Sequence, residues 1–494
     1  MSWTDSCDCL TVIFGLLVLG LCWYILKRPK NFPPGPYGLP LVGYAPFLEN
    51  NLADDFMKMK KKYGSVMSVQ IGRKDWVILN DFDTINEAFL KQGEAFSGRP
   101  NNFFLKIIAQ GRGVVARDYG PGVKILRKFG LMTLRGFGVG KKGMERNVVE
   151  ETELLVESLT SKNNNNLHGK ITLAVSNIIC RIVFGSRFEY EDKKFHRMLE
   201  ILAMFFANTS DAKMLALMSI APILRFIPPF RGALKRAMDG VDELTGYIRE
   251  IIEEHKSSFD ENDIRDFIDA FLKEMRSRDK NDPNFNNIQL IQYIRDLFEA
   301  GTGTTTNTLR WAILCFANYP EYQEKIAKEI ENVLGEGGIP SMKHRDDMPY
   351  TCAFIQELMR HRTLIPLSVF HKTNEDATLK GYNIPRNTTV CSNIWSVHFD
   401  PRHFENPREF RPERFLDRDG KFIKSNHVIP FSIGPRHCLG EQLARMEVFI
   451  FLTGIVQKLG VVRKPNETLP PFDVGVFKVI TYKALDFEVN FEKR

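Results

Sequence analysis

The feature that most constrains the fold of this chain is one cysteine placed between a tight turn and an apolar helical pattern. Cys438 lies in residues 430–441 (PFSIGPRHCLGE), where Gly434 and Pro435 favour a turn and an apolar repeat begins at Leu439. A thiolate at a helix N-terminus is stabilised by the helix dipole, and the thiolate is the form of cysteine that binds a metal. The pattern therefore indicates a metal-ligating cysteine at the start of a helix.

The residues around Cys438 suit a flat cofactor that carries carboxylates. Gly440 leaves bare backbone against which a ring system can lie, Arg436 can donate charge-assisted hydrogen bonds, and Phe431 can keep water from the sulfur. A buried structural cysteine is one alternative. A zinc site is another, against which the lack of a second cysteine or a suitably spaced histidine argues. The combination favours a haem-thiolate site.

This stretch resembles the signature Phe-x-x-Gly-x-Arg-x-Cys-x-Gly of the cytochrome P450 family at every fixed position. The resemblance implies haem b (iron protoporphyrin IX), with Cys438 as the axial iron ligand and Phe431, Arg436 and Gly440 among the cofactor-binding residues. It also implies a mainly α fold with small β-sheets, in which a single large haem-binding domain follows an N-terminal membrane anchor. Microsomal, family-2-like members are the most similar.

Composition agrees with a globular protein of this kind. The 494 residues are 44% hydrophobic and 26% charged, which allows a large core and little disorder. The net charge of +7 is diffuse, so it suits anionic lipid or an acidic partner and argues against nucleic acid. The eight cysteines form no disulfide framework, which indicates a reducing compartment; they stand at positions 7, 9, 22, 180, 315, 352, 391 and 438.

The N-terminus predicts a membrane anchor. Residues 10–26 form an apolar run that, with its flanks, reaches the length of a bilayer span; acidic residues precede it and basic residues follow it. The positive-inside rule then leaves everything after Lys30 in the cytosol. A cleaved signal peptide is the competing interpretation, but it would need basic residues first and a small-residue cleavage site. We expect a single-pass protein of the endoplasmic reticulum membrane with a cytosolic catalytic domain.

Three segments follow from this interpretation. They are a transmembrane signal anchor with a basic stop over residues 1–30, a stiff proline-rich hinge over 31–43, and a catalytic haem-thiolate domain over 44–494. Within the last, residues 221–236 mix apolar and basic side chains around two prolines. This segment is either an ordinary helix–loop–helix corner or a second patch that dips into the membrane interface.

The sequence offers no site for a nicotinamide cofactor. Residues 138–143 match G-x-G-x-x-G by letters, but no strand pattern precedes them and no acid follows at the ribose spacing. Electrons from NADPH must then arrive through a partner. The resemblance implies a flavoprotein reductase, with cytochrome b5 as a further donor, so that NADPH and flavins act only through that partner.

A long helix with a weakened centre is predicted over residues 287–318. Its middle, 300–306, reads AGTGTTT, and glycine costs up to about 1 kcal/mol relative to alanine in a helix. Small residues let a ligand approach, and a threonine hydroxyl can bond locally or to that ligand. A notch for a crossing helix is the alternative. The segment resembles the family's Ala/Gly-Gly-x-Asp/Glu-Thr-Thr motif, which makes Thr304 the oxygen-activating, catalytic threonine.

The same motif contains a departure. Gly303 stands where the family usually has an acid, which removes one proton relay and puts coupling in doubt. Glu299 lies a little over one turn earlier, but helical side chains lean toward the N-terminus and thus away from Thr304. We expect water chains through Thr304 to deliver protons, with Glu299 as a minor catalytic contributor or a substrate contact.

Other motifs predict the frame around the site. Glu357 and Arg360 lie one turn apart in a helix that starts near Tyr350, and with Arg414 of FRPERF they resemble the family's Glu-x-x-Arg and Phe-x-Pro-x-Arg-Phe elements. The resemblance implies a buried structural triad. Short strand patterns are predicted over residues 66–71 and 76–79.

The resemblance also assigns haem propionate ligands. Arg127, in VKILR, aligns with the arginine of the family's Trp-x-x-x-Arg, and Val123 replaces the tryptophan, so one propionate bond is lost. His371 falls where another propionate ligand is expected. A basic cluster at the proximal face is predicted to dock the acidic reductase, unless its members are simply solvated; it comprises Lys124, Arg127, Lys128, Lys141 and Lys142.

A lipophilic substrate is expected because the pocket residues implied by the resemblance are apolar or aromatic. These are Phe103, Val114, Phe205, Phe298, Ala300, Val369 and Phe477. They do not choose between a fatty acid, a steroid, a terpenoid and a xenobiotic. In the implied reaction the thiolate of Cys438 favours O–O cleavage, and one oxygen atom from O2 enters the substrate. A haem-thiolate isomerase or dehydratase acting on a peroxide, and a non-enzymatic haem sensor, are the alternatives.

Overall fold

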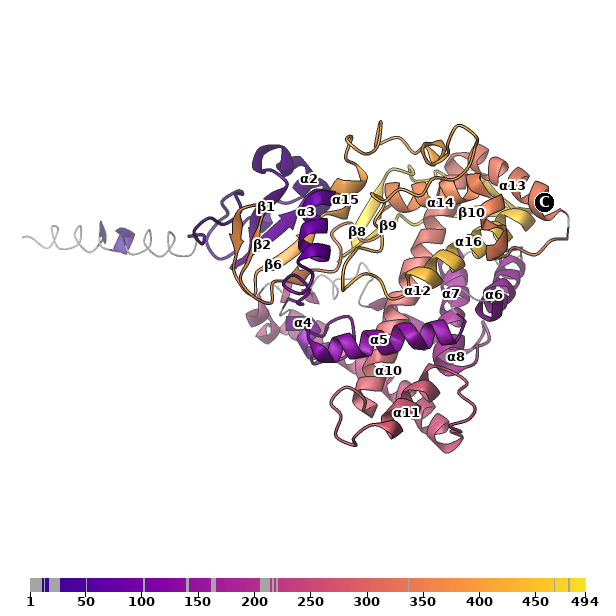
Figure 1. Ribbon diagram of the computed structural model, residues 1–494, viewed down its shortest axis with the longest axis horizontal. Helices are drawn as coiled ribbons and strands as arrows, with labels where there is room; N and C mark the ends of the chain where they lie inside the picture. The colour runs from indigo at the N-terminus through magenta and orange to yellow at the C-terminus, as the bar shows by residue number, and fades with distance from the viewer. Residues whose placement is uncertain are drawn as a thin grey trace, which may run out of the picture. The chain divides into compact units, whose positions relative to one another are not determined.

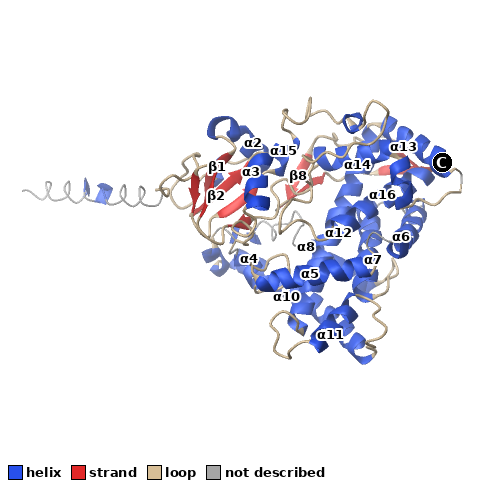
Figure 2. Ribbon diagram, in the orientation of Figure 1, coloured by secondary structure: helices blue, strands red, loops and turns tan. Residues whose placement is uncertain are grey.

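A computed structural model describes most of the chain. It describes residues 11–12, 14–16, 27–49, 51–100, 103–138, 142–160, 166–204, 214–215, 217–218, 221–335, 337–465, 467–478 and 480–494. These form two compact units: residues 1–100 with 367–397, and residues 101–366 with 398–494. Helices dominate the second unit, whereas the first unit combines strands with a few short helices (Figure 2). The expected mainly α fold with small sheets is confirmed.

The first unit is built on a four-stranded sheet in the order β1-β2-β6-β3. β1 (Val66–Ile71) and β2 (Lys74–Leu79) form an antiparallel hairpin, β6 (Thr389–Ser392) joins β2 in parallel, and β3 (His371–Lys372) closes the other edge. Both strands expected from the pattern are present, the second beginning two residues earlier than predicted. The other elements of this unit are η1 (Ala45–Phe47), α2 (Leu52–Tyr63), α3 (Phe82–Asn86), η2 (Glu87–Lys91), β4 (Ala377–Leu379) and β5 (Tyr382–Ile384); α15 (Ile394–His398) crosses the boundary.

The second unit is a bundle of helices with two small hairpins. Its hairpins pair β7 (Leu459–Arg463) with β10 (Val489–Lys493), and β8 (Gly475–Lys478) with β9 (Thr481–Ala484). Its helices are α4 (Phe103–Ala109), α5 (Pro121–Gly136), α6 (Lys142–Thr160), α7 (Leu167–Phe184), α8 (Lys193–Met204), η3 (Pro222–Phe226), α10 (Pro228–Ser257), α11 (Phe267–Ser277), α12 (Asn287–Asn318), α13 (Pro320–Leu334), η4 (Met342–Asp347), α14 (Pro349–His361), η5 (Pro412–Phe415) and α16 (Glu441–Lys458).

The long helix α12 is the centre of this bundle, and its bounds are those predicted from the sequence. The side chain of Asn286 accepts a hydrogen bond from the N–H of Gln289 and caps the first turn, and Pro320 begins the next helix. α12 packs against α7 and α16 (Figure 1) and is buried along most of its length. This packing compensates for the poor helix propensity of its Gly- and Thr-rich middle.

A buried ion-pair group fixes the connection between α14 and the loop that follows α15. Arg360 donates from Nε and Nη2 to the carboxylate of Glu357 (2.6 and 2.8 Å), and Arg414 Nε donates to the same carboxylate (3.1 Å). The Glu357 and Arg360 side chains are fully buried. Arg360 also donates to backbone carbonyls within residues 398–409. The structure thus brings together the three residues of the expected triad.

The expected membrane anchor, residues 10–26, lies for the most part outside the described residues. Within the part of the chain that the structure describes, α7 alone is long and apolar enough to cross a membrane, and most of it is buried in the second unit. Its composition is therefore explained by its place in the core. The boundaries expected at residues 30 and 43 stay predictions.

Replacing Arg360 by methionine is expected to lower the free energy of unfolding by about 3–5 kcal/mol, because the carboxylate of Glu357 would lose its bidentate partner in the core. Urea denaturation of the purified variant measures this. Arg411→Met is the matched control: its guanidinium reaches the exposed Glu405 (2.9 Å), and its loss should cost less than about 1 kcal/mol. Equal losses in the two variants would contradict the structural role of the buried pair.

Candidate functional site

The loop that carries Cys438 is closed by its own backbone. Ser432 and Gly434 adopt positive φ angles of 60° and 83°, and the N–H of Cys438 donates to the carbonyl of Phe431 (2.9 Å). Gly434, as predicted, occupies a conformation that favours glycine. α16 begins three residues after the cysteine, with Gly440 at its N-cap position. The sulfur is thereby held at the start of a helix by a turn that the sequence encodes locally.

Cys438 differs from the other cysteines that the structure describes. The other four are buried, whereas Cys438 is exposed. Burial nevertheless raises the pKa of its thiol, against the N–H of Gly440 and the charge of Arg127, which both lower it. From this combination of access and desolvation we infer that the side chain lines an internal hollow, the space before the sulfur of Cys438. The predicted helix-terminus effect is present in the N–H of Gly440, but in the protein alone burial outweighs it.

One face of α12 is also open, at the predicted weak point. Ala300 and Gly303 are exposed and Thr304 is half-buried, in a helix whose neighbouring turns are largely buried. A Cβ built on Gly303 would meet no atom within 4 Å, and the same holds for Gly440 beside the cysteine. Both glycines therefore border open space. At Gly301 the alternative holds, because a Cβ there would lie 2.5 Å from Ile179 of α7, so this glycine is a notch for the packed helix.

Thr304 lies on the open face with its hydroxyl turned to its own helix. Oγ1 donates to the carbonyl of Ala300 (2.7 Å), and Asn307 and Thr308 make equivalent bonds to the carbonyls of Gly303 and Thr304 (2.6 and 3.0 Å). This is the local bonding expected of threonine in a helix. The lone pairs of Oγ1 stay available to a donor in the hollow.

Three hydrogen bonds connect α12, α5 and the cysteine loop. Tyr293 donates to the carbonyl of Leu126 (2.9 Å), Arg127 Nη2 donates to the carbonyl of His437 (2.6 Å), and Thr305 donates to Glu447 of α16 (2.8 Å). A Cβ at position 130 of α5 would clash with the Tyr293 hydroxyl, so a glycine is required there for the close approach. The open face of α12 and the cysteine therefore belong to one connected framework.

Glu447 was not singled out from the sequence. It is fully buried, burial raises its pKa to about 8, and Thr305 is its one hydrogen-bond donor among the described residues. The signal that could have found it is a single acid in an otherwise apolar stretch of α16. It holds the back of α12 opposite the open face.

Two arginines concentrate positive charge beside the cysteine loop. Arg436 is buried and donates to the carbonyls of Val114 and Arg117 (3.1 and 2.6 Å). Burial, and after it the charge of Arg127, lower the pKa of Arg436 to about 10, so the two cations are neighbours. A buried cation next to a half-buried one favours an anionic group between or beside them. Arg436 was expected to clamp a carboxylate; the structure shows that backbone carbonyls also fix it.

His371, the other expected propionate ligand, belongs to the first unit. Its ring stacks on Phe89 with centroids 4.1 Å apart, and Nδ1 bonds to the carbonyl of Phe96 (2.8 Å). These contacts bury the imidazole and fix its orientation. Phe431, expected to cover the sulfur, is half-buried and has the guanidinium of Arg445 4.9 Å from its ring centroid.

Two acids of α12 lie one turn apart and differ in their partners. Asp296 accepts hydrogen bonds from the N–H groups of Val114 and Val115 (2.6 and 3.0 Å), which ties this segment to the helix. Glu299 is paired by charge with Arg295, with 3.7 Å between Oε1 and Nη2, and the like charge of Asp296 is also close enough to act on it. Burial raises the pKa of Glu299 to about 7, which the charge of Arg295 opposes.

The expected substrate residues occupy different environments. Ala300 is exposed, Val369 and Phe477 are half-buried, and Val114 is buried. Phe298 is 2% exposed and stacks on Phe184 of α7 (5.2 Å), so its ring belongs to the core and is not accessible to a ligand. The side chain of Phe103 and the whole of Phe205 lie outside the described residues.

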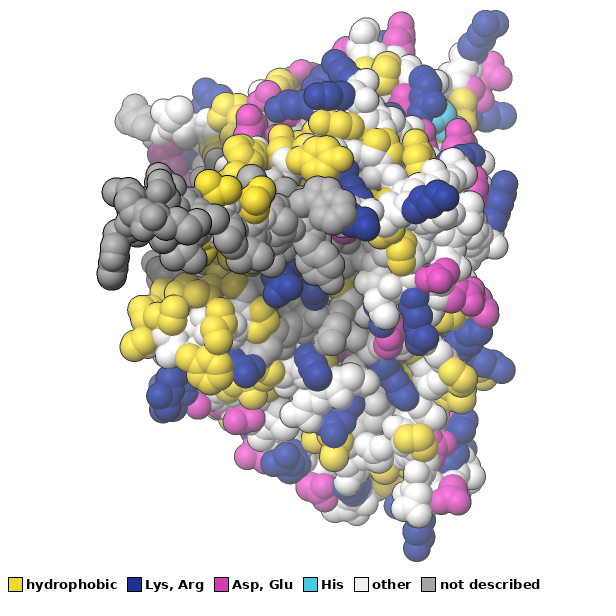
Figure 3. Space-filling view, turned by 90° about the vertical axis from the view of Figure 1, so that its left-hand side faces the viewer, with side chains coloured by type: hydrophobic (Ala, Val, Ile, Leu, Met, Phe, Trp, Pro, Cys, Tyr) yellow, Lys and Arg dark blue, Asp and Glu magenta, His cyan; other side chains and the backbone are white. Residues whose placement is uncertain are grey.

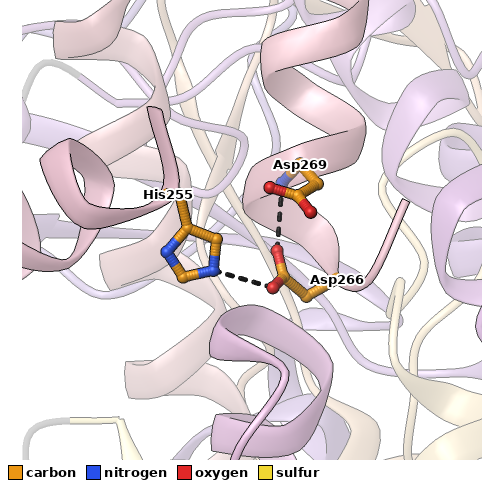
Figure 4. Close-up of side chains that lie close together, drawn as sticks. All are labelled: His255, Asp266 and Asp269. Carbon is orange, nitrogen blue, oxygen red and sulfur yellow. Dashed lines mark hydrogen bonds and ion pairs between the residues drawn. The ribbon is translucent and has the colours of Figure 1, made fainter. Parts of the chain in front are cut away.

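Another group of side chains has the spacing of a metal site but is saturated by the protein. Ligand atoms of His255, Asp266 and Asp269 lie within 4.8 Å of one another (Figure 4). Asp266 caps α11 through the N–H of Asp269 and bonds to His255 (2.8 Å), while Arg265 binds Asp269 through two nitrogens. Burial lowers the pKa of His255, but the bond and charge of Asp266 raise it by more. The group joins α10 to α11, and we assign no metal to it.

The residues around Cys438 fit a haem. A soft sulfur ligand reaches a hollow, two bare glycines border open space, and two cations suit the propionates of iron protoporphyrin IX. Zinc, or another metal held by several side chains, does not suit this site. Within the described residues, no group of His, Cys, Asp and Glu side chains with metal-binding spacing includes Cys438.

Comparison with known proteins agrees with this site. A family model described as Cytochrome P450 matches residues 33–490. The chain is 41% identical to cytochrome P450 2J3 of Rattus norvegicus, covering 90% of this chain and 88% of the relative. It is 35% identical to cytochrome P450 2U1 of Homo sapiens (97% and 92%) and 37% identical to cytochrome P450 2B15 of Rattus norvegicus (95% and 96%). The chain therefore belongs to the cytochrome P450 family, the haem-thiolate monooxygenases that use haem b.

Proposed function

We propose that this chain inserts one oxygen atom from O2 into a lipophilic small molecule, with electrons that come from NADPH through a flavoprotein reductase. The observation that carries the proposal is the accessible sulfur of Cys438 just before α16, in the same hydrogen-bonded framework as the open face of α12. When bound, haem supplies the activation of oxygen and the electron transfer that this reaction needs.

The protein's own side chains have separate tasks in this proposal. Cys438 ligates the iron, and Phe431 keeps water from the sulfur. Arg127 and Arg436 hold propionates by charge, while backbone bonds keep both guanidiniums in place. His371 is proposed as a further propionate ligand. Gly440 leaves room for the ring.

Thr304 is proposed to hold and pass protons at Oγ1. Its bond to the carbonyl of Ala300 orients the hydroxyl, so that the oxygen can accept a hydrogen bond from water or ligand in the hollow. Gly303 supplies no acid, so the proton reaches Thr304 through water. The minor role in proton delivery predicted for Glu299 stays a prediction. The amount of product that an E299Q variant forms per NADPH tests it.

The proposed reductase surface is an open groove on α5 and the cysteine loop. It has a volume of about 440 Å³ and is lined by basic residues, including Lys124 and Lys128, around the apolar Leu131 and Met132. Met132 is 63% exposed, so the groove combines positive charge with an apolar contact. Such a surface suits an acidic electron-transfer protein, a flavoprotein reductase or cytochrome b5.

We propose location at the endoplasmic reticulum membrane through the N-terminal run, with the catalytic part in the cytosol. Residues 222–227 support a second lipid contact, because Ile223, Phe226 and Ile227 are exposed in η3 and just before α10. Figure 3 shows a face on which hydrophobic side chains gather, with Lys, Arg and some acidic side chains around them. Flotation of the chain with lipid vesicles, with and without residues 1–30, tests both contacts.

The alternatives are separated by their use of electrons. An isomerase or dehydratase acting on a peroxide would form product without NADPH, and a sensor would form none. We expect NADPH consumption that requires both the reductase and a lipophilic compound, with an oxygenated product.

Replacing Cys438 by serine is expected to abolish the spectrum of the reduced, CO-bound thiolate complex, because serine does not supply the soft anionic ligand. The measurement is the difference spectrum of equal amounts of purified protein. Cys352→Ser is the control, because Cys352 is buried in α14 and donates to a backbone carbonyl as serine can. A Cys438→Ser protein with the wild-type spectrum would show that Cys438 is not the iron ligand.

Thr304→Ala should lower the product formed per NADPH by on the order of tenfold, because proton delivery at Oγ1 is lost while electron entry is not. Product and NADPH are measured together in the reconstituted system. Thr308→Ala removes an equivalent hydroxyl one turn later, which donates to the carbonyl of Thr304, and should leave the ratio near the wild-type value. If the two variants formed similar amounts of product per NADPH, the role proposed for Thr304 in proton delivery would be contradicted.

Lys128→Glu should raise the KM for the reductase about fivefold at low ionic strength, with a smaller effect as salt is added, because exposed charges are screened. Turnover against reductase concentration gives this value. Lys193→Glu makes the same charge change on α8, at an exposed position outside the groove, and should have little effect. An equal effect of both variants would show that net charge and not the groove matters.

A further inference from the structure

We propose that Glu299 is a specificity-determining residue that selects lipophilic amines, by accepting a hydrogen bond from a protonated nitrogen in the hollow beside α12. The inference rests on the proposed function, because it takes the open face of α12 as a wall of the substrate site. It adds the chemical class of the polar group that the substrate carries.

The place of Glu299 on the helix directs it to this face. Residues three and four apart in a helix share one side, so Glu299 lies on the same side as Gly303, which is exposed as Ala300 is. The Glu299 side chain is 26% exposed although it stands in the middle of a buried helix. Gly303 carries no side chain that could cover the carboxyl group. The accessible part of Glu299 therefore faces a space that a ligand can enter.

The carboxylate of Glu299 has no hydrogen-bond partner within the described residues. Its nearest cation is Arg295, and a separation of 3.7 Å is too long for a hydrogen bond. Arg295 cannot turn toward a ligand, because its side chain is 4% exposed and Nη1 donates to Gln292 Oε1 (3.2 Å). An accessible acceptor thus stands beside a buried donor, and only the acceptor is within reach of a ligand.

Asp296 shows what a structural acid at this place looks like. It is 5% exposed, and its carboxylate accepts bonds from two backbone N–H groups and from Gln292. Its hydrogen-bonding capacity is used to fix residues 114–115 to α12. Glu299, one turn later, is paired by charge with Arg295 but accepts no hydrogen bond from the described residues, so its carboxyl can still accept one from a ligand.

Charge favours an amine over an anionic or purely apolar ligand. A desolvated carboxylate gains most from a cationic donor, since hydrogen bonds to charged groups are the strong ones. An alkane would leave the carboxyl unpaired in a dry pocket, which is costly, and an alkanoate would be repelled. The pKa of Glu299, raised by burial to about 7, means that an incoming cation draws the group into its ionised form.

The test compares two ligands of one shape on the purified, haem-loaded protein. One is N,N-diisopropyloctylamine, which is protonated at neutral pH and too crowded at nitrogen to coordinate iron; the other is the hydrocarbon with carbon in place of nitrogen. Equilibrium dialysis gives the Kd of each. We expect Glu299→Gln to weaken amine binding about tenfold or more and to leave the hydrocarbon within about twofold. Glu299→Asp should retain part of the preference.

Glu321→Gln is the matched control, because it removes the same charge from an exposed position in the first turn of α13. It should change neither Kd. The reduced CO spectrum of each variant shows that the haem site is intact. Haem-loaded wild type and Glu299→Gln proteins that bind the amine equally would overturn this inference alone. Failure of the wild type to take up haem would instead overturn the proposed function.

Discussion

The hydrogen bond from the N–H of Cys438 to the carbonyl of Phe431 closes the loop on which the rest of the site depends. It fixes the sulfur at the first turn of α16, where the N–H of Gly440 also points to it. A sulfur held in this way needs a dry but open space before it. The remaining helices of the second unit must therefore pack tightly around a hollow instead of filling it.

α12 meets this demand by being buried along most of its length while one face of its middle stays open. Its Gly- and Thr-rich middle is a poor helix in isolation, and packing against α7 and α16 holds it in shape. The bond from Thr305 to Glu447 anchors the back of the same turn whose front is open. One face of the helix thus contributes stability and the other gives a ligand access to the hollow. Because Ala300 and Gly303 are small and exposed, they contribute little side-chain packing.

Several elements could be predicted because their signals are local. The bounds of α12 follow from an Asn cap, an apolar pattern and a terminating proline, and the turn at Gly434 follows from its residue type. The meeting of Glu357, Arg360 and Arg414 was expected from motif resemblance, and a charged group of that kind in an apolar helix needs partners. The side-chain position of Phe298 could not be predicted, because a phenylalanine at that helical position suits either the hollow or the core.

By itself, the sequence determined the metal-binding loop, the weakened helix and the family, since each depends on residue types at fixed short spacings. Only the tertiary structure decided which side chains border the hollow and which are used elsewhere. Asp296 and Glu299 are both acids in the same stretch of one helix. The backbone N–H groups of residues 114–115 bind the carboxylate of Asp296, whereas the carboxylate of Glu299 stays accessible. The difference between the two acids depends on a contact between Asp296 and a segment about 180 residues earlier in the chain. The spacing of residues along α12 alone cannot predict that contact.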